Sequence, residues 1–108
     1  MKRFDENYRL LAEMYRDGYF PDFLVDKVKA LIQNVIDFLE TGERDLNKIQ
    51  KKFDEMTLAI NDLEEEFDDN DSELETVARD SIAVSVMYIL KWFDIDIDIE
   101  DALGARDW

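Results

Sequence analysis

The first half of the chain carries apolar side chains at spacings of three and four residues, which is the period of an amphipathic helix. The first stripe consists of Tyr8, Leu11, Ala12 and Tyr15. It predicts a helix over about residues 5–17, which Gly18 ends. Two acidic residues at its start, Asp5 and Glu6, favour the dipole of that helix.

A second stripe predicts a longer helix. It consists of Leu24, Val28, Leu31, Ile32, Val35 and Leu39. Pro21 suits the first turn of this helix, because its φ is already helical and its missing N–H would have no partner there. Gly42 is a typical helix stop. The second helix is therefore expected between Pro21 and Gly42.

The third stripe is the narrowest and most regular. Its members recur at alternating steps of three and four: Leu46, Ile49, Phe53, Met56, Ile60, Leu63 and Phe67. This spacing is that of the a and d positions of a coiled coil, and it predicts one helix over residues 46–67 with Asp45 as N-cap. Such a seam can also pair with a second copy of the chain, so a homodimer is one alternative.

The last long helix is expected to begin at Ser72, because Ser72 and Glu75 match a capping box. Between Ile82 and Phe93 almost every residue is apolar. We therefore expect this helix to be the most buried one, in a central position, with the second and third helices on either side of it.

The tail alternates acidic and apolar residues over 94–99, which is the pattern of a strand. The sequence offers no second strand to pair with it, so we expect an extended link. Asp98 can cap a short helix over residues 99–103 that Gly104 ends. The sequence thus predicts an all-α, four-helix bundle-like single domain over residues 1–108, with a short C-terminal helical segment.

Composition narrows the chemistry. The chain has 108 residues, 28 of them acidic and 13 basic, and a net charge of −15. It contains neither His nor Cys, which excludes disulfides, zinc fingers and catalysis by imidazole or thiol groups. Its charge is expected to repel nucleic acids and anionic membranes. The longest apolar-rich stretch, residues 82–93, is too short to span a bilayer, so we expect a cytoplasmic protein. No motif in the chain indicates a cofactor, and none is expected.

The negative charge is concentrated in the second half. Residues 55–108 contain 17 acidic and 3 basic residues, a net charge of −14, whereas residues 1–54 carry −1. The candidate partner-binding residues come from two acidic runs: Glu64, Glu65, Glu66, Asp68, Asp69, Asp71, Glu73, Asp94, Asp96 and Asp98. Most of the first run falls at the C-terminal end of the predicted third helix, where the dipole favours cations. Acids that oppose folding in this way are typical of a functional surface, and the alternative is that they only keep the protein soluble.

These features predict a non-enzymatic acidic binding protein. An acidic surface attracts a cationic partner and speeds association. The predicted partner is therefore a basic protein, such as the nuclease-like toxin that an immunity or inhibitor protein neutralises. This prediction rests on an analogy of type.

The alternative from another class is a carboxylate-based divalent-metal enzyme, similar to helical nucleotide pyrophosphohydrolases. Such enzymes hold magnesium with a Glu-x-x-Glu pair followed by a Glu-x-x-Asp pair. Glu40 with Glu43, and Glu65 with Asp68, have this spacing. Gly42 would break the helix of the first pair, so no metal ligand is assigned.

Four aromatic residues surround the turn at Gly18 and Pro21: Tyr15, Tyr19, Phe20 and Phe23. Aromatic side chains beside a turn more often fill the gap where two helices meet. The alternative is that they anchor an interface.

Several stretches together resemble a small uncharacterised bacterial protein family. They are Met14-Tyr15-Arg16-Asp17-Gly18-Tyr19-Phe20-Pro21, Leu24 to Val28, Ala59 to Leu63, Ser72-Glu73-Leu74-Glu75-Thr76 and Arg106-Asp107-Trp108. The resemblance covers nearly the whole chain and implies a helical domain of about 110 residues with no assigned activity. It implies no catalytic residues.

Overall fold

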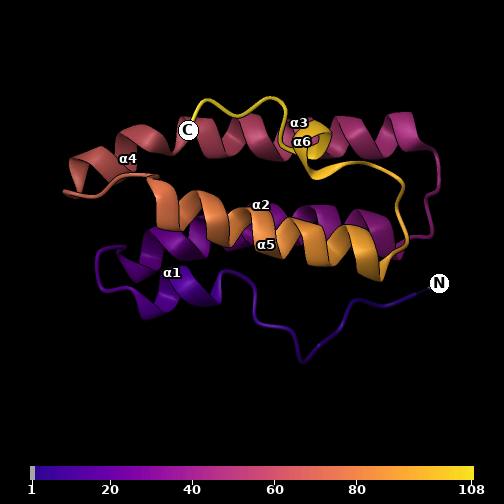
Figure 1. The fold of residues 1–108 in the computed structure, drawn as a ribbon, viewed down its shortest axis with the longest axis horizontal. Coiled ribbons are helices and arrows are strands. Elements are labelled where there is room, and N and C mark those ends of the chain that lie inside the picture. Colours follow the sequence, from indigo (N-terminus) through magenta and orange to yellow (C-terminus); the bar gives the residue numbers. More distant parts are fainter. Residues whose placement is uncertain (1) are drawn as a thin grey trace.

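The computed structural model describes residues 2–108, so Met1, the first residue of the expected 1–108 domain, lies outside the described residues. The described chain is all-α, as predicted, and contains no strand. Three long and three short helices follow one another along it (Figure 1). In chain order they are α1 (Ala12–Arg16), α2 (Asp22–Glu40), α3 (Leu46–Asp62), α4 (Glu64–Asp69), α5 (Thr76–Trp92) and α6 (Ile99–Ala102).

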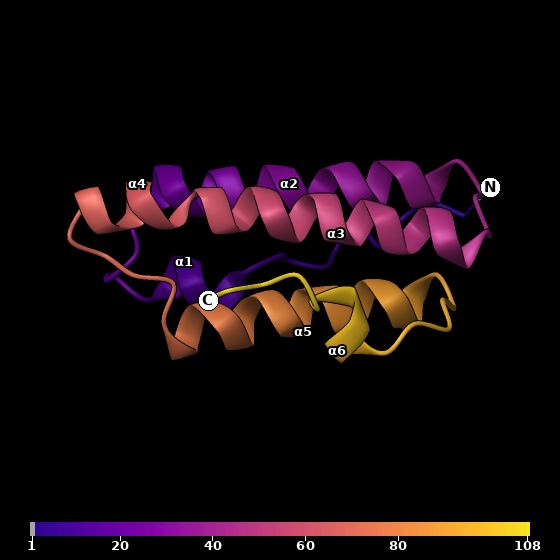
Figure 2. The ribbon, with the colours of Figure 1, turned by 90° about the horizontal axis from the view of Figure 1, so that it is seen from above.

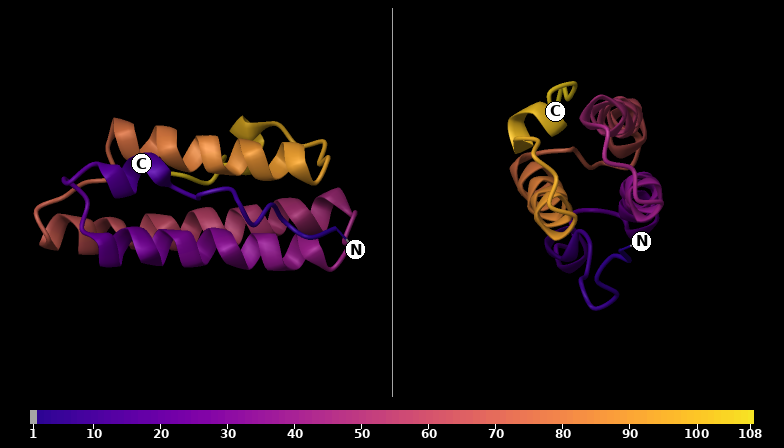
Figure 3. Two further views of the ribbon diagram at one scale, coloured as in Figure 1. Left: turned by 90° about the horizontal axis from the view of Figure 1, so that it is seen from below. Right: turned by 90° about the vertical axis from the view of Figure 1, so that its right-hand side faces the viewer.

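The helices surround the hydrophobic core as a ring. α2 and α3 run antiparallel as one layer, and α5 lies on the other side of the core (Figure 2). α1 contacts both α2 and α5, and α6 contacts both α3 and α5, so these two short helices close the sides of the ring (Figure 3). Fully buried side chains from the ring include Met14, Leu24, Ile32, Phe53, Ile60 and Ile82.

The helix predicted over residues 5–17 is shortened to α1. Leu11 has a left-handed backbone conformation (φ 58°), which a continuous helix cannot contain. Residues 2–11, called the N-terminal strap from here on, instead pack on α5. Tyr8 stacks on Tyr88 of that helix, with ring centroids 3.9 Å apart. Packing on a distant helix therefore overrides the local apolar spacing.

α2 and the start of α3 agree with the prediction. Pro21 is the N-cap of α2 and precedes its first turn. Gly42, just after the C-cap of α2, has a φ of 90°, the left-handed conformation that ends many helices. The Asp45 carboxylate caps α3 by accepting a hydrogen bond from Asn47 N–H at 2.9 Å.

The single helix predicted over residues 46–67 is interrupted. Leu63 N–H donates to the Ile60 carbonyl in a three-residue step, and α4 begins at Glu64. The seam continues across the interruption, because Phe53 and Phe67 are both fully buried in the core of the chain itself. These buried seam residues are therefore not accessible to a second copy.

α5 begins at Thr76, four residues later than predicted. The capping box does not form, because Glu75 occupies the N-cap position and no side chain caps the helix. Residues 72–75 are a non-helical connection. Ser72 is only 1% exposed, and its hydroxyl has no hydrogen-bond partner within the described part of the chain.

The expectation that this helix is central is also wrong. α5 buries Ile82, Val86 and Ile89, but Val84 is 57% exposed and Met87 52% exposed. The ring arrangement explains this difference, because only one face of α5 meets the core and the opposite face meets solvent.

The tail agrees with the prediction. Residues 95–98 form a non-helical link in which Ile95 is buried and Asp96 is exposed. Asp98 occupies the N-cap position of α6, but its side chain makes no capping hydrogen bond among the described residues. None of the helices within residues 2–108 has the length and apolar character that crossing a membrane requires.

Candidate functional site

The first acidic run lies at one end of the molecule, on α4 and the segment that follows it (Figure 1). Its exposed members are called the α4 acidic face: Glu65, Asp68, Asp69, Asp71 and Glu73. Glu64 and Glu66 are half-buried.

The helix dipole acts on this run differently than expected. α4 is a helix of its own, so Glu64, Glu65 and Glu66 occupy its first turn, where the dipole favours acids. The expectation that the run opposes a dipole is wrong for these three residues. It holds for Asp68 and Asp69, which lie at the C-terminal end of α4.

The ion pairs of this region leave the α4 acidic face charged. Lys27 Nζ of α2 donates to both carboxylate oxygens of the neighbouring Glu66 at 2.8 Å. In the part of the chain that the structure describes, no residue of the α4 acidic face forms an ion pair with Lys or Arg. The negative charge of this face is therefore directed at solvent.

The turn after α4 forms a Schellman motif. Asp71 has a left-handed backbone (φ 57°), and its N–H donates to the Asp68 carbonyl at 3.1 Å. Ser72 N–H reaches back to the Phe67 carbonyl at 2.8 Å. These are the two bonds that define the motif, so Asp71 has a structural role in ending the helix.

The second acidic run lies on the link between α5 and α6. α5 begins at the end of the molecule where α4 lies and extends along the long axis to the other end, where the link of residues 94–98 to α6 starts (Figure 1). All three are exposed. The structure therefore does not bring the two predicted runs together into one surface.

Asp94 also serves the end of a helix. It has a φ of 56°, and Ile95 N–H donates to the Leu90 carbonyl at 2.8 Å, which again forms a Schellman motif. The Arg44 guanidinium donates to the Phe93 carbonyl at 2.8 Å and to the Asp94 carbonyl at 3.1 Å. This cation stabilises the negative end of the α5 dipole.

Glu64 faces the C-terminal tail. Its Oε1 atom is buried and has no hydrogen-bond partner among residues 2–108. A side-chain hydrogen bond with Asp107, together with partial burial, raises the pKa of Glu64 to about 7. Asn61 holds the tail in place, because its Nδ2 donates to the Ala105 carbonyl at 3.0 Å and its Oδ1 accepts from Asp107 N–H at 3.1 Å. No local sequence pattern indicated this pair of carboxyl groups.

The carboxylates of the metal-enzyme alternative do not converge. Glu40 and Glu43 lie at the C-terminal end of α2, where both accept hydrogen bonds from backbone N–H groups. Glu65 and Asp68 lie on α4, at the other end of the molecule. Within residues 2–108, no three Asp or Glu side chains are grouped so that they could hold one metal ion.

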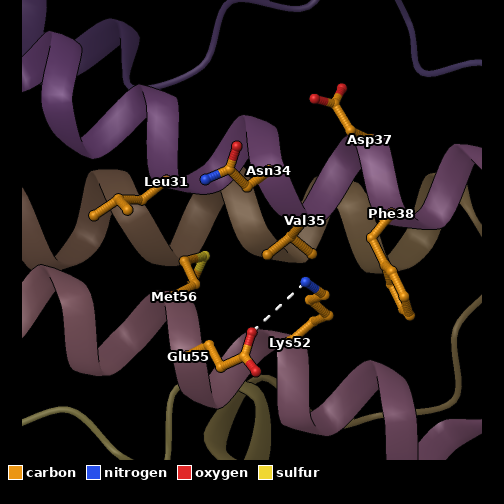
Figure 4. A pocket seen from close by; sticks show the side chains of 8 residues that line it. All are labelled: Leu31, Asn34, Val35, Asp37, Phe38, Lys52, Glu55 and Met56. Carbon is orange, nitrogen blue, oxygen red and sulfur yellow. Dashed lines mark ion pairs between the residues drawn. The ribbon is translucent and has the colours of Figure 1, made fainter.

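A groove of about 520 Å³ lies between α2 and α3 (Figure 4). Val35 and Met56 supply apolar parts of its lining. Lys52 Nζ lies 3.6 Å from Glu55 Oε2 and 5.2 Å from the centre of the Phe38 ring. The lysine of the groove is thus already paired, and neither acidic run contributes to the lining.

Comparison with known proteins identifies a family. Its sequence model matches residues 4–108, and it is described as a family of unknown function (DUF5713). No curated protein and no solved structure matches the chain. The predicted resemblance to a small family without an assigned activity is confirmed.

Proposed function

Since the chain belongs to DUF5713, a family of unknown function, we propose a function on the basis of its charged surface. The protein is a cytoplasmic, non-enzymatic binding protein that neutralises a basic partner. Its class is that of immunity or inhibitor proteins acting on a nuclease-like toxin. The α4 acidic face is the contact surface.

The observation that carries this proposal is that the five carboxylates of the α4 acidic face have no ion pairs within residues 2–108. Five exposed carboxylates lie on one short helix and the segment after it, and in residues 2–108 none of them pairs with Lys or Arg. Like charges at this spacing repel one another, and Asp68 and Asp69 also oppose the α4 dipole. A basic partner supplies the positive charge that the chain itself does not.

Electrostatic attraction over a distance also favours fast binding. Interactions of this kind extend over about 10 Å at 0.1 M salt and about 3 Å at 1 M salt. The association rate with a basic partner should therefore fall steeply with ionic strength.

The geometry narrows the set of contact residues. Asp94 follows the end of α5 that lies away from α4, and Asp96 and Asp98 lie on the link to α6, so a small partner on α4 would not reach them. Glu66 is already paired with Lys27. The proposed contact is thus limited to the α4 acidic face.

Two variants of equal charge test this assignment. The α4 charge variant carries Glu65→Gln, Asp68→Asn and Asp69→Asn. The far-end charge variant carries Asp94→Asn, Asp96→Asn and Asp98→Asn. Each removes three negative charges from the net charge of −15, so both have a net charge of −12. Asn suits the left-handed and N-cap positions that Asp94 and Asp98 occupy.

Each protein is immobilised and used to isolate partners from cells of the source organism. We expect the wild type and the far-end charge variant to retain the same basic protein, and the α4 charge variant to lose it. The enzymatic activity of the retained protein should fall when the wild type is added. Equal retention by both variants would show that the α4 acidic face is not the contact.

A further inference from the structure

Two exposed aromatic side chains lie at the same end of the molecule as the α4 acidic face. Tyr19 is 44% exposed and Phe23 is 52% exposed, whereas Phe20 between them is only 2% exposed. The expectation that these aromatics fill the gap between two helices is therefore confirmed for Phe20 and wrong for the other two. Exposed aromatic residues are common anchors in protein interfaces.

Direct contacts hold Tyr19 next to α4, and Lys27, one turn after Phe23 on α2, pairs with Glu66 of α4. Tyr19 packs edge-on against Phe20, with ring centroids 5.2 Å apart. Phe20 in turn packs edge-on against Phe67, the buried residue of α4, at 6.5 Å. The start of α2 and α4 consequently lie side by side in both Figure 1 and Figure 2.

The environment of the Tyr19 hydroxyl is acidic. Burial of this group raises the pKa of Tyr19, and the carboxylates of Glu73, Glu75 and Asp68 raise it further. The neighbouring Ser72 side chain acts in the opposite direction and lowers that pKa by a smaller amount. The exposed Tyr19 ring and these carboxylates thus meet at one surface.

We infer that Tyr19, Phe23 and the α4 acidic face together form a binding site for an arginine-containing segment of a basic partner. This inference rests on the proposed function and specifies the chemistry of the ligand. A guanidinium group stacks on an aromatic face and donates two parallel hydrogen bonds to a carboxylate, and lysine does neither as well. The site therefore selects arginine over lysine.

Two labelled peptides measure this selectivity by fluorescence anisotropy. Both are 12 residues long and alternate serine with a basic residue, which is arginine in one and lysine in the other. We expect wild type to bind the arginine peptide more tightly. Phe23→Ala and Tyr19→Ala should each weaken that binding by about 3–30-fold, because they remove a stacking partner. In the same variants, the fold-loss of affinity for the lysine peptide should be less than half of the fold-loss for the arginine peptide. Met87→Ala, which removes a side chain as exposed as Phe23 from α5, should leave both affinities unchanged.

The charge variants separate this inference from the proposed function. If Phe23→Ala and Tyr19→Ala bind the arginine peptide within twofold of wild type while the α4 charge variant loses it, the aromatic site is refuted and the acidic contact stands. If both charge variants bind equally, the proposed function fails as well. Equal losses for the two peptides in Phe23→Ala would overturn the selectivity for arginine. Phe23 is half exposed, so its removal should leave the thermal unfolding curve unchanged and the variant folded.

Discussion

The hydroxyl oxygen of Ser85 on α5 accepts a hydrogen bond from the backbone N–H of Leu11 at 3.0 Å, inside the core. Leu11 is the left-handed residue at the N-cap of α1, a position whose backbone N–H has no partner inside the helix. The bond therefore satisfies a buried donor that the strained turn would otherwise leave without a partner.

Replacing Ser85 with Ala should consequently destabilise the protein. The substitution leaves the Leu11 N–H buried and unpaired, which costs about 1–3 kcal/mol of unfolding free energy. Urea unfolding followed by tryptophan fluorescence measures this loss. Ser81→Ala is the matched control, since Ser81 is also a buried serine of α5 but has no hydrogen bond to the strap, and it should cost less.

Asp94→Gly should stabilise the protein by about 0.5–1 kcal/mol. The backbone of Asp94 is left-handed, which is a strained conformation for aspartate but an easy one for glycine. Asp96→Gly removes the same charge two residues later, at a position without a positive φ, and should give no gain. Equal changes in the two midpoints of urea unfolding would contradict the backbone explanation.

Glu64→Gln should change the dependence of stability on pH. The folded protein keeps the Glu64 proton up to about pH 7, whereas the unfolded chain loses it near the ordinary value of 4.5. The folded state therefore binds more protons between these values, and this group's contribution to stability falls as the pH rises through that window.

The size of the effect is limited by the partial exposure of the carboxyl group to water, so we expect Glu64→Gln to gain about 1 kcal/mol over wild type at pH 8. At pH 4.5 and below, the two proteins should have similar stability. Urea unfolding curves at both pH values give the comparison. Glu65→Gln on the exposed side of α4 is the control, and the same pH-dependent gain in that variant would exclude the Glu64–Asp107 pair as the cause.

Neutralising Asp68 and Asp69 together should raise stability by about 0.3–1 kcal/mol at low salt, because both carboxylates lie at the negative end of the α4 dipole. Neutralising Glu65 should bring no such gain, since it occupies the first turn. Thermal unfolding at 20 mM and 500 mM salt checks both statements. The gain from the aspartate pair should shrink at the higher salt concentration.

Local signals were sufficient to predict the long helices. The stripes of α2 and α3, the Asp45 cap and the Gly42 stop each depend on residues within one or two turns of one another. The same kind of pattern failed where distant contacts decide the conformation. Tyr8 and Leu11 have helical spacing, yet Tyr8 stacks on Tyr88, and this packing favours a strap over a helix.

The α4 acidic face could likewise be predicted from the sequence only in part. The acidic composition of residues 64–73 is visible in the sequence, and so is its excess of charge. The sequence did not reveal that Phe23 is exposed beside this run or that Asp107 reaches Glu64, because each depends on how separate segments pack. It also could not tell that Asp71 and Asp94 hold left-handed positions at helix ends.

The N-terminal strap sets an order for folding during synthesis. Its residues leave the ribosome first. Glu40 of α2 accepts a hydrogen bond from Phe4 N–H at 2.7 Å, but the other groups that hold the strap belong to α5: Trp92 Nε1 donates to the Arg3 carbonyl at 2.8 Å, and Tyr88 donates to the Asp5 carboxylate at 2.6 Å. The nascent chain can therefore complete the attachment of its earliest segment only when almost all of the protein has emerged.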